Sequence, residues 1–141
     1  MSALRIFLAG LVAFLVGDFV WLGVLMRGFY REALAPIALT DATGALAPIW
    51  GAALLVYLLL VAGVQVFALP RGGGRLLPTA GWGAVFGVVT FGVYDLTNLA
   101  TLRGFPPRLV VVDLLWGACV CAGVAVTMRL AEGQRPAVRT T

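Results

Sequence analysis

The sequence predicts an all-α integral membrane protein that folds as a four-helix bundle in a single domain. Of its 141 residues, 62% are hydrophobic and 11% are charged, and the mean hydropathy is +1.03. Soluble domains carry about 25% charged residues, so this composition excludes a soluble protein. Four apolar segments approach the roughly 20 residues that cross a bilayer as a helix. We place these spans at residues 5–26, 49–69, 80–102 and 109–130.

The first span must be distinguished from a cleavable signal peptide, because a single arginine, Arg5, precedes its apolar run. The run is too long for a signal peptide, contains Asp18, and reaches Arg27 without a small-residue cleavage site. We therefore expect the segment to be retained as a membrane helix.

The connections between the spans differ in length and composition. Residues 27–48 form the longest connection, and we expect a short interfacial helix around 28–35. Residues 70–78 form a turn rich in Gly and Pro. The connection 103–108 is very short, so the third and fourth spans must be antiparallel neighbours. The polar tail, 131–141, is expected to be disordered.

Two parts of the chain resemble each other. Asp18 precedes an Arg-Gly-Phe sequence at 27–29, and Asp95 precedes the same sequence at 103–105. This similarity predicts that the bundle consists of two pseudo-repeated helical hairpins. Chance, combined with the shared chemistry of helix ends, is the alternative explanation.

The composition also excludes several kinds of chemistry. All ten basic residues are Arg, His is absent, and Ser2 is the only serine. A Schiff-base lysine, a histidine ligand for haem or zinc, and a histidine base are therefore excluded. Cys119 and Cys121 project from different helix faces and are best explained as apolar filler, with a redox or metal pair as the alternative. We expect no cofactor, no metal and no catalytic residue, and the sequence favours a non-enzymatic role.

The arginines predict a topology. The net charge is +4, and arginines at helix ends suit anionic lipid headgroups better than nucleic acid. Six arginines fall on the side of the two termini and four on the other side, which favours cytoplasmic termini by the positive-inside rule. The six are Arg5, Arg71, Arg75, Arg129, Arg135 and Arg139, and the four are Arg27, Arg31, Arg103 and Arg108.

Three of the six acidic residues, Asp18, Asp95 and Asp113, lie inside predicted spans. A charge at bilayer depth costs roughly 2.5–3.5 kcal/mol, so such residues usually face the bundle interior and mark a site. At 1.5 Å per residue, each aspartate lies about 7–13 Å inside an arginine at the end of its helix. All three therefore fall in the half of the membrane next to the 27–48 connection, where we expect them to converge.

Other polar and aromatic side chains share this depth. Helical spacing places Trp21 on the face of Asp18, and Trp116 on the face of Asp113. The predicted ligand pocket contains Asp18, Trp21, Tyr57, Tyr94, Asp95, Asn98, Asp113 and Trp116, with Arg27, Arg31, Arg103 and Arg108 at its mouth. The alternative is a polar network that only locks helix packing, at about 0.6 kcal/mol for each interhelical bond.

Two long motifs carry a family resemblance. The stretch `GDFVWLGVLMRGFYR`, residues 17–31, and the stretch `YDLTNLATLRGFPPRLVVVDLLWG`, residues 94–117, resemble a bacterial membrane-protein family catalogued as domain of unknown function 2177. The resemblance implies four spanning helices in the bacterial inner membrane. It implies no established activity, so it assigns no role to any residue.

The function that these features favour is binding or movement of a small molecule, a lipid headgroup or a proton in the polar pocket. An accessory subunit that stabilises a larger membrane complex is the alternative, and an intramembrane lipid-modifying enzyme is less favoured. The expected partners are the lipid bilayer and a small-molecule or lipid ligand. Gly83 and Gly87 predict close helix packing, with a homodimer seam as the alternative.

Overall fold

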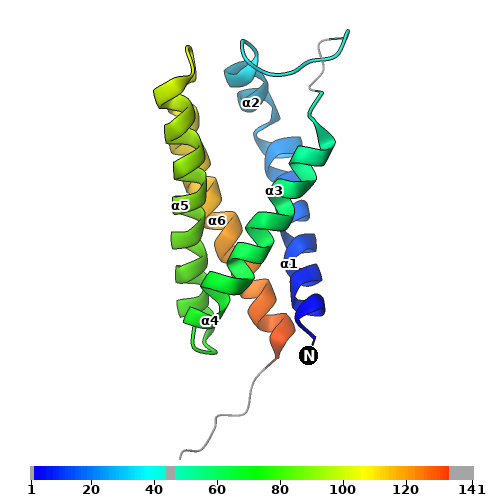
Figure 1. Ribbon diagram of the computed structural model, residues 1–141, viewed down its shortest axis with the longest axis vertical. Helices are drawn as coiled ribbons and strands as arrows, with labels where there is room; N and C mark the ends of the chain where they lie inside the picture. Colours follow the sequence, from blue (N-terminus) through cyan, green and yellow to red (C-terminus); the bar gives the residue numbers. More distant parts are fainter. Residues whose placement is uncertain (1, 44–46, 134–141) are drawn as a thin grey trace, which may run out of the picture.

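The computed structural model describes residues 2–43 and 47–133, and this part of the chain is all-helical. Four long helices run along the molecule (Figure 1), and each is long and apolar enough to cross a membrane. The protein is therefore a multi-pass protein embedded in the membrane. The helical elements are α1 (Ala3–Asp18), the π-helical η1 (Phe19–Leu25), α2 (Arg27–Leu34), α3 (Trp50–Gly63), the π-helical η2 (Val64–Ala68), α4 (Leu69–Arg71), α5 (Leu76–Thr101) and α6 (Pro107–Glu132).

Each of the first two membrane spans is one continuous helix that comprises more than one of these labelled elements. The first runs from Ala3 to Leu25 and the second from Trp50 to Arg71, each passing from α-helix into a π-helical stretch. α5 and α6 are the third and fourth spans. We call the end of the bundle that carries α2 and the turn 102–106 the α2 end, and the opposite end, with Ser2 and the turn 72–75, the terminal end (Figure 1).

Proline and glycine set several helix boundaries. α5 begins at Leu76 and contains Pro78 in its first turn, where the missing N–H would have had no helical partner. Gly104 has a φ of 81°, a conformation that L side chains rarely adopt, and it lets the chain reverse before α6. α6 ends at Glu132, so it includes the start of the tail predicted to be disordered. The remainder of that tail lies outside the described residues.

α5 and α6 lie side by side along their length and form the closest helix pair (Figure 1). The cause is a glycine seam, which we define as Gly83, Gly87 and Gly117. A side chain at Gly87 would overlap the carbonyl group of Gly117, and one at Gly117 would overlap the ring of Phe91. The small residues of α5 therefore serve packing inside the bundle, as the sequence predicted.

The other two spans are arranged differently. α1 packs against α6, and Gly10 makes room there for the side chain of Met128. α3 slants across the bundle, contacting α1 and reaching α5 and α6 through η2 near the terminal end (Figure 1). The α1–α3 pair is thus less closely packed than the α5–α6 pair. The pseudo-repeat of two hairpins stays a prediction.

Candidate ligand site at the α2 end

Asp18 is the last residue of α1, and an aromatic donor from another span holds its carboxylate. The indole N–H of Trp116, on α6, donates a hydrogen bond of 2.8 Å to Asp18 Oδ1. Trp116 also stacks on Trp21 of η1, with ring centroids 4.6 Å apart and planes 2° from parallel. Tyr57 of α3 lies near the same carboxylate, and its ring meets Phe14 edge-on. The Asp18 carboxylate is thereby fixed in one orientation.

α2 reaches the membrane-embedded residues through Tyr30, which is 9% exposed. The Tyr30 hydroxyl donates a hydrogen bond to Asp113 Oδ1 and accepts one of 3.1 Å from Trp21 Nε1. Burial raises the pKa of the Tyr30 hydroxyl above its ordinary value, and the hydrogen bond to Asp113 raises it further. The hydroxyl therefore stays protonated and remains a donor. Around it, α2 packs its apolar face on Phe105 and Leu109.

Asp95 of α5 is 0% exposed and lies beside Asp113. Among the described residues, neither of its carboxylate oxygens has a hydrogen-bond partner of normal geometry. A buried polar group without a partner costs about 1–3 kcal/mol, so proteins rarely retain one without a reason. Within the same described residues, no group of three acidic, His or Cys side chains is arranged to hold a metal ion.

These contacts join five elements into one polar and aromatic network. It runs from Asp18 through Trp116 and Trp21 to Tyr30, and from there through Asp113 to Asp95. α1, η1, α2, α5 and α6 all contribute a side chain to this network. The three aspartates of the spans are therefore close neighbours at the α2 end.

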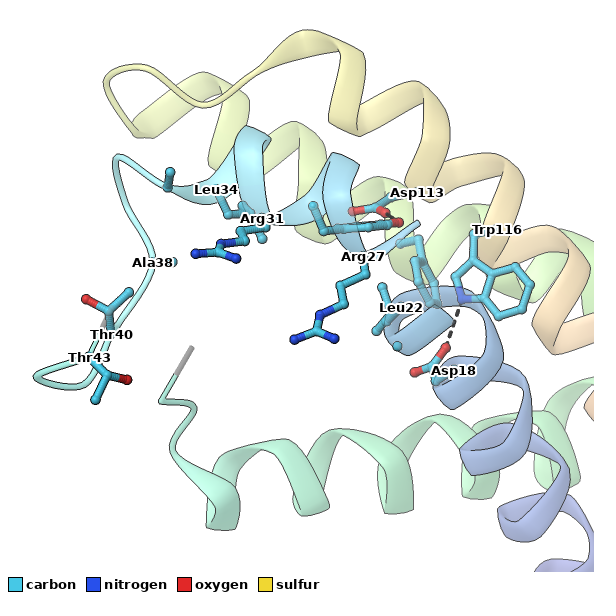
Figure 2. Close-up of a pocket in the computed structure, with 14 residues that line it drawn as sticks. Asp18, Leu22, Arg27, Arg31, Leu34, Ala38, Thr40, Thr43, Asp113 and Trp116 are labelled. Carbon is cyan, nitrogen blue, oxygen red and sulfur yellow. Dashed lines mark hydrogen bonds between the residues drawn. The ribbon is translucent and has the colours of Figure 1, made fainter. Parts of the chain in front are cut away.

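A cavity of about 970 Å³ opens beside this network. Figure 2 shows the Asp18 carboxylate at its inner side and the guanidinium groups of Arg27 and Arg31 extending into it from α2. This volume lies within the range typical of small-molecule sites, roughly 300–1,000 Å³. The lining residues are Asp18, Leu22, Gly23, Arg27, Tyr30, Arg31, Leu34, Ala35, Ala38, Thr40, Thr43, Phe91, Asp113 and Trp116.

A second, apolar cleft of about 520 Å³ adjoins the cavity between α3 and α5. The two spaces share three lining residues, Asp18, Phe91 and Asp113. The cleft exists because α3 slants away from α5 toward the α2 end. Its other lining residues are Phe14, Ala53, Val56, Tyr57, Leu59, Leu60, Thr90 and Tyr94.

Some residues of the predicted pocket lie elsewhere. Tyr94 is 63% exposed and lines the cleft but not the cavity. Asn98 is half-buried and lines neither space. Arg103 is exposed and also lines neither. Arg108 forms an exposed ion pair of 2.9 Å with Glu32, so it does not pair with an aspartate of the network.

Sequence reasoning missed Tyr30, although it makes the central contact of the network. The signal was present in the pattern of α2. Phe29 and Ala33 fall on one helix face and Arg27 and Arg31 on the other, with Tyr30 at the boundary between the two faces, where it is buried and lines the cavity beside the arginines. An amphipathic helix at a membrane surface must bury its apolar face, so its tyrosine was a candidate for contact with the spans.

A comparison with protein families matches residues 3–130 to a model described as "Predicted membrane protein (DUF2177)". The chain belongs to the DUF2177 family. This confirms the resemblance read from residues 17–31 and 94–117, and every residue of the network lies within the matched stretch. Comparisons with curated proteins and with solved structures found no match.

Proposed function

We propose that this DUF2177 protein binds a small polar molecule or a lipid headgroup in the cavity at the α2 end. The observation that carries the proposal is the pair Asp18 and Asp113. They come from two membrane helices, are each held by an aromatic donor, and line one cavity together with two arginines. Movement of the ligand, or of a proton, across the membrane stays a prediction.

The fixed orientation of the Asp18 carboxylate favours ligand binding over a purely structural role for the network. A carboxylate has about four acceptor sites, and on Asp18 Trp116 occupies one of them while the Tyr57 hydroxyl lies close enough to occupy a second. The remaining acceptor capacity can meet a hydroxyl or ammonium donor of a ligand at little entropic cost, because the carboxylate is already oriented. Packing alone would be served better by a filled interior than by a cavity.

A thermal-shift screen of the full-length protein in mild detergent tests the proposal, using soluble metabolites and phospholipids as probes. A ligand at 100 times its Kd stabilises the folded state by about 2.7 kcal/mol. We expect this stabilisation to be lost in Asp18→Asn and Asp113→Asn. Glu32→Gln is the matched control, because it makes the same acid-to-amide change at an exposed position outside the cavity. Equal ligand shifts in the wild type and both aspartate variants would refute the proposal.

For the location, we propose the inner membrane of a bacterium, with both termini in the cytoplasm and the α2 end outside. The arginine distribution supports this orientation. Thr40→Cys and Gly73→Cys place exposed thiols at opposite ends. A membrane-impermeant maleimide added to intact cells should label the first variant and spare the second, and the reverse pattern would overturn the orientation.

The two other functions stay predictions of the sequence. The glycines that suggested a partner surface lie inside the bundle, which reduces the support for an accessory subunit. A stoichiometric partner that copurifies in mild detergent would restore that support. A lipid-modifying activity requires turnover by the purified protein that is lost in Asp95→Asn.

A further inference from the structure

We propose that the ligand is a phospholipid-type amphiphile. Its phosphate is bound by Arg27 and Arg31, a hydroxyl or ammonium group of its head meets Asp18 and Asp113, and its acyl chain occupies the cleft between α3 and α5. This inference rests on the proposed function and specifies the ligand class of the same site.

Two arginines of α2 support the inference that the ligand carries a phosphate group. Arg27 and Arg31 are one helical turn apart on α2, and both guanidinium groups extend into the cavity (Figure 2). Neither forms an ion pair with any described residue, although Glu32 is a sequence neighbour of one of them. Glu32 pairs with Arg108 instead, which leaves two adjacent guanidinium groups without a carboxylate partner among the described residues. Guanidinium groups present paired donors that match phosphate oxygens.

The carboxylates point to a second group on the same head. Asp18 and Asp113 line the inner side of the cavity, and the arginines project from α2. A ligand that carried only negative charge would be repelled by the carboxylates, and a purely cationic ligand would be repelled by the arginines. A phosphate linked to a hydroxyl or ammonium donor complements both walls, and glycerol and ethanolamine phospholipids have such headgroups.

The cleft points to an acyl chain. It shares Asp18, Phe91 and Asp113 with the cavity, so one molecule can occupy both spaces. Val56 and Leu59 of α3 line the cleft and are also exposed on the surface of a membrane span. The cleft therefore communicates with the hydrocarbon of the bilayer, from which an acyl chain can enter laterally without crossing water.

Native mass spectrometry of the full-length protein in detergent measures the headgroup preference. We expect phosphatidylglycerol and phosphatidylethanolamine to bind more tightly than phosphatidylcholine, whose headgroup has no hydrogen-bond donor. Removing an arginine near the membrane surface should weaken binding roughly fivefold for Arg31→Gln and roughly 30-fold for the Arg27→Gln/Arg31→Gln double variant. Arg103→Gln removes the same charge from an exposed position outside the cavity and should bind as the wild type does.

A cleft-filling substitution tests the acyl chain separately. Ala53→Phe places a ring in the cleft, whereas Ala52→Phe places one on the exposed neighbouring position. We expect Ala53→Phe to weaken phospholipid binding and to leave binding of soluble glycerol 3-phosphate unchanged. Ala52→Phe should change neither.

Each alternative result overturns a defined part of the assignment. If all three phospholipids bind equally, or if the arginine double variant binds like the wild type, the headgroup assignment is wrong. If glycerol 3-phosphate binds as tightly as the phospholipids and Ala53→Phe has no effect, the ligand is a soluble phosphate and not a lipid. If phospholipids fail to bind but another compound gives a thermal shift that requires Asp18 and Asp113, the proposed function stands and this inference falls.

Discussion

The glycine seam and the cavity at the α2 end lie next to each other in the bundle but differ in packing. The helices are in close contact at the seam and are separated by open space at the cavity. At the seam, α5 and α6 approach so closely that Gly83 and Gly87 have no room for a methyl group. At the cavity, α1, α2 and α6 surround about 970 Å³ of space lined by charged groups. Asp95 of α5 lies beside Asp113, which lines the cavity, and it is fully buried with no hydrogen-bond partner of normal geometry among the described residues.

This difference in packing predicts that the seam determines the stability of the protein and that the cavity determines ligand binding. Close contact along the seam provides the dispersion energy that holds membrane helices together, since lipid offers them no hydrophobic driving force. The helices around the cavity lack that contact, and the polar groups between them lower the free energy of unfolding. This is the pattern expected where a site is retained for function. Substitutions in the seam should therefore change folding, and substitutions in the cavity should change ligand binding more than folding.

The largest effect is expected from Gly87→Leu in the seam. The new side chain would collide with the backbone of Gly117, and overpacking of this kind costs about 3 kcal/mol. Gly81→Leu is the matched control, because it adds the same side chain to the same helix where no atom lies within 4 Å. Unfolding in detergent, followed by circular dichroism, should separate the two variants. Equal stability would show that the seam is not tightly packed.

A smaller loss is expected from Tyr30→Phe. The change removes the donor to Asp113 and the acceptor for Trp21, at a cost of about 2 kcal/mol because the partners are left unpaired. Tyr94→Phe removes a hydroxyl from a mostly exposed ring and should be neutral. The free energy of unfolding should be measured for both variants. If Tyr30→Phe is also neutral, α2 is not held on the spans by this hydroxyl.

A gain in stability is expected from Asp95→Asn. The substitution replaces a fully buried carboxyl group, which has no hydrogen-bond partner of normal geometry among the described residues and lies beside a second carboxylate, with a neutral amide. The free energy of unfolding should therefore rise by about 1 kcal/mol. Asp113→Asn should instead lower stability, because Asp113 accepts the hydrogen bond of Tyr30. Lower stability of Asp95→Asn would indicate that the carboxylate is satisfied in the folded protein.

The smallest effect is expected at alkaline pH. The pKa of the Tyr30 hydroxyl is raised in the folded protein, whereas an unfolded tyrosine titrates near about 10. The stability that this shift contributes is fully present below the unfolded pKa and is lost as the pH rises above it. The unfolding midpoint should therefore fall less steeply above about pH 10 in Tyr30→Phe than in the wild type. Parallel curves would contradict the raised pKa.

The fold class and much of the site geometry could be predicted from residue types and helical spacing. Continuous apolar runs identify membrane spans because every backbone polar group must be satisfied internally, which leaves the helix as the available structure. The free-energy cost of exposing a carboxylate to lipid likewise explains why the aspartates inside such runs lie near one another in the bundle interior. The spacing of Asp18 and Trp21, and of Asp113 and Trp116, placed these side chains on common faces.

What helical spacing could not supply was the relative placement of the helices. Tyr94 and Asp95 are adjacent on α5, but α6 covers only one of them, and the slant of α3 leaves the other facing a cleft. The π-helical stretch η1 also departs from the regular 3.6-residue period, so the error of a regular helical projection grows with each residue after Asp18. The docking of Tyr30 depends on a contact between residues 83 positions apart, which no local pattern encodes.

The parallel stack of Trp21 and Trp116 has a practical consequence. Two indole rings in face-to-face contact share their electronic excitation, so the pair absorbs and emits differently from the solitary indoles of Trp50 and Trp82. One ring belongs to the first span and the other to the last, and both are hydrogen-bonded within the network. The unlabelled protein thus carries an intrinsic optical reporter, and any event that shifts these two spans relative to each other should be visible in its spectrum.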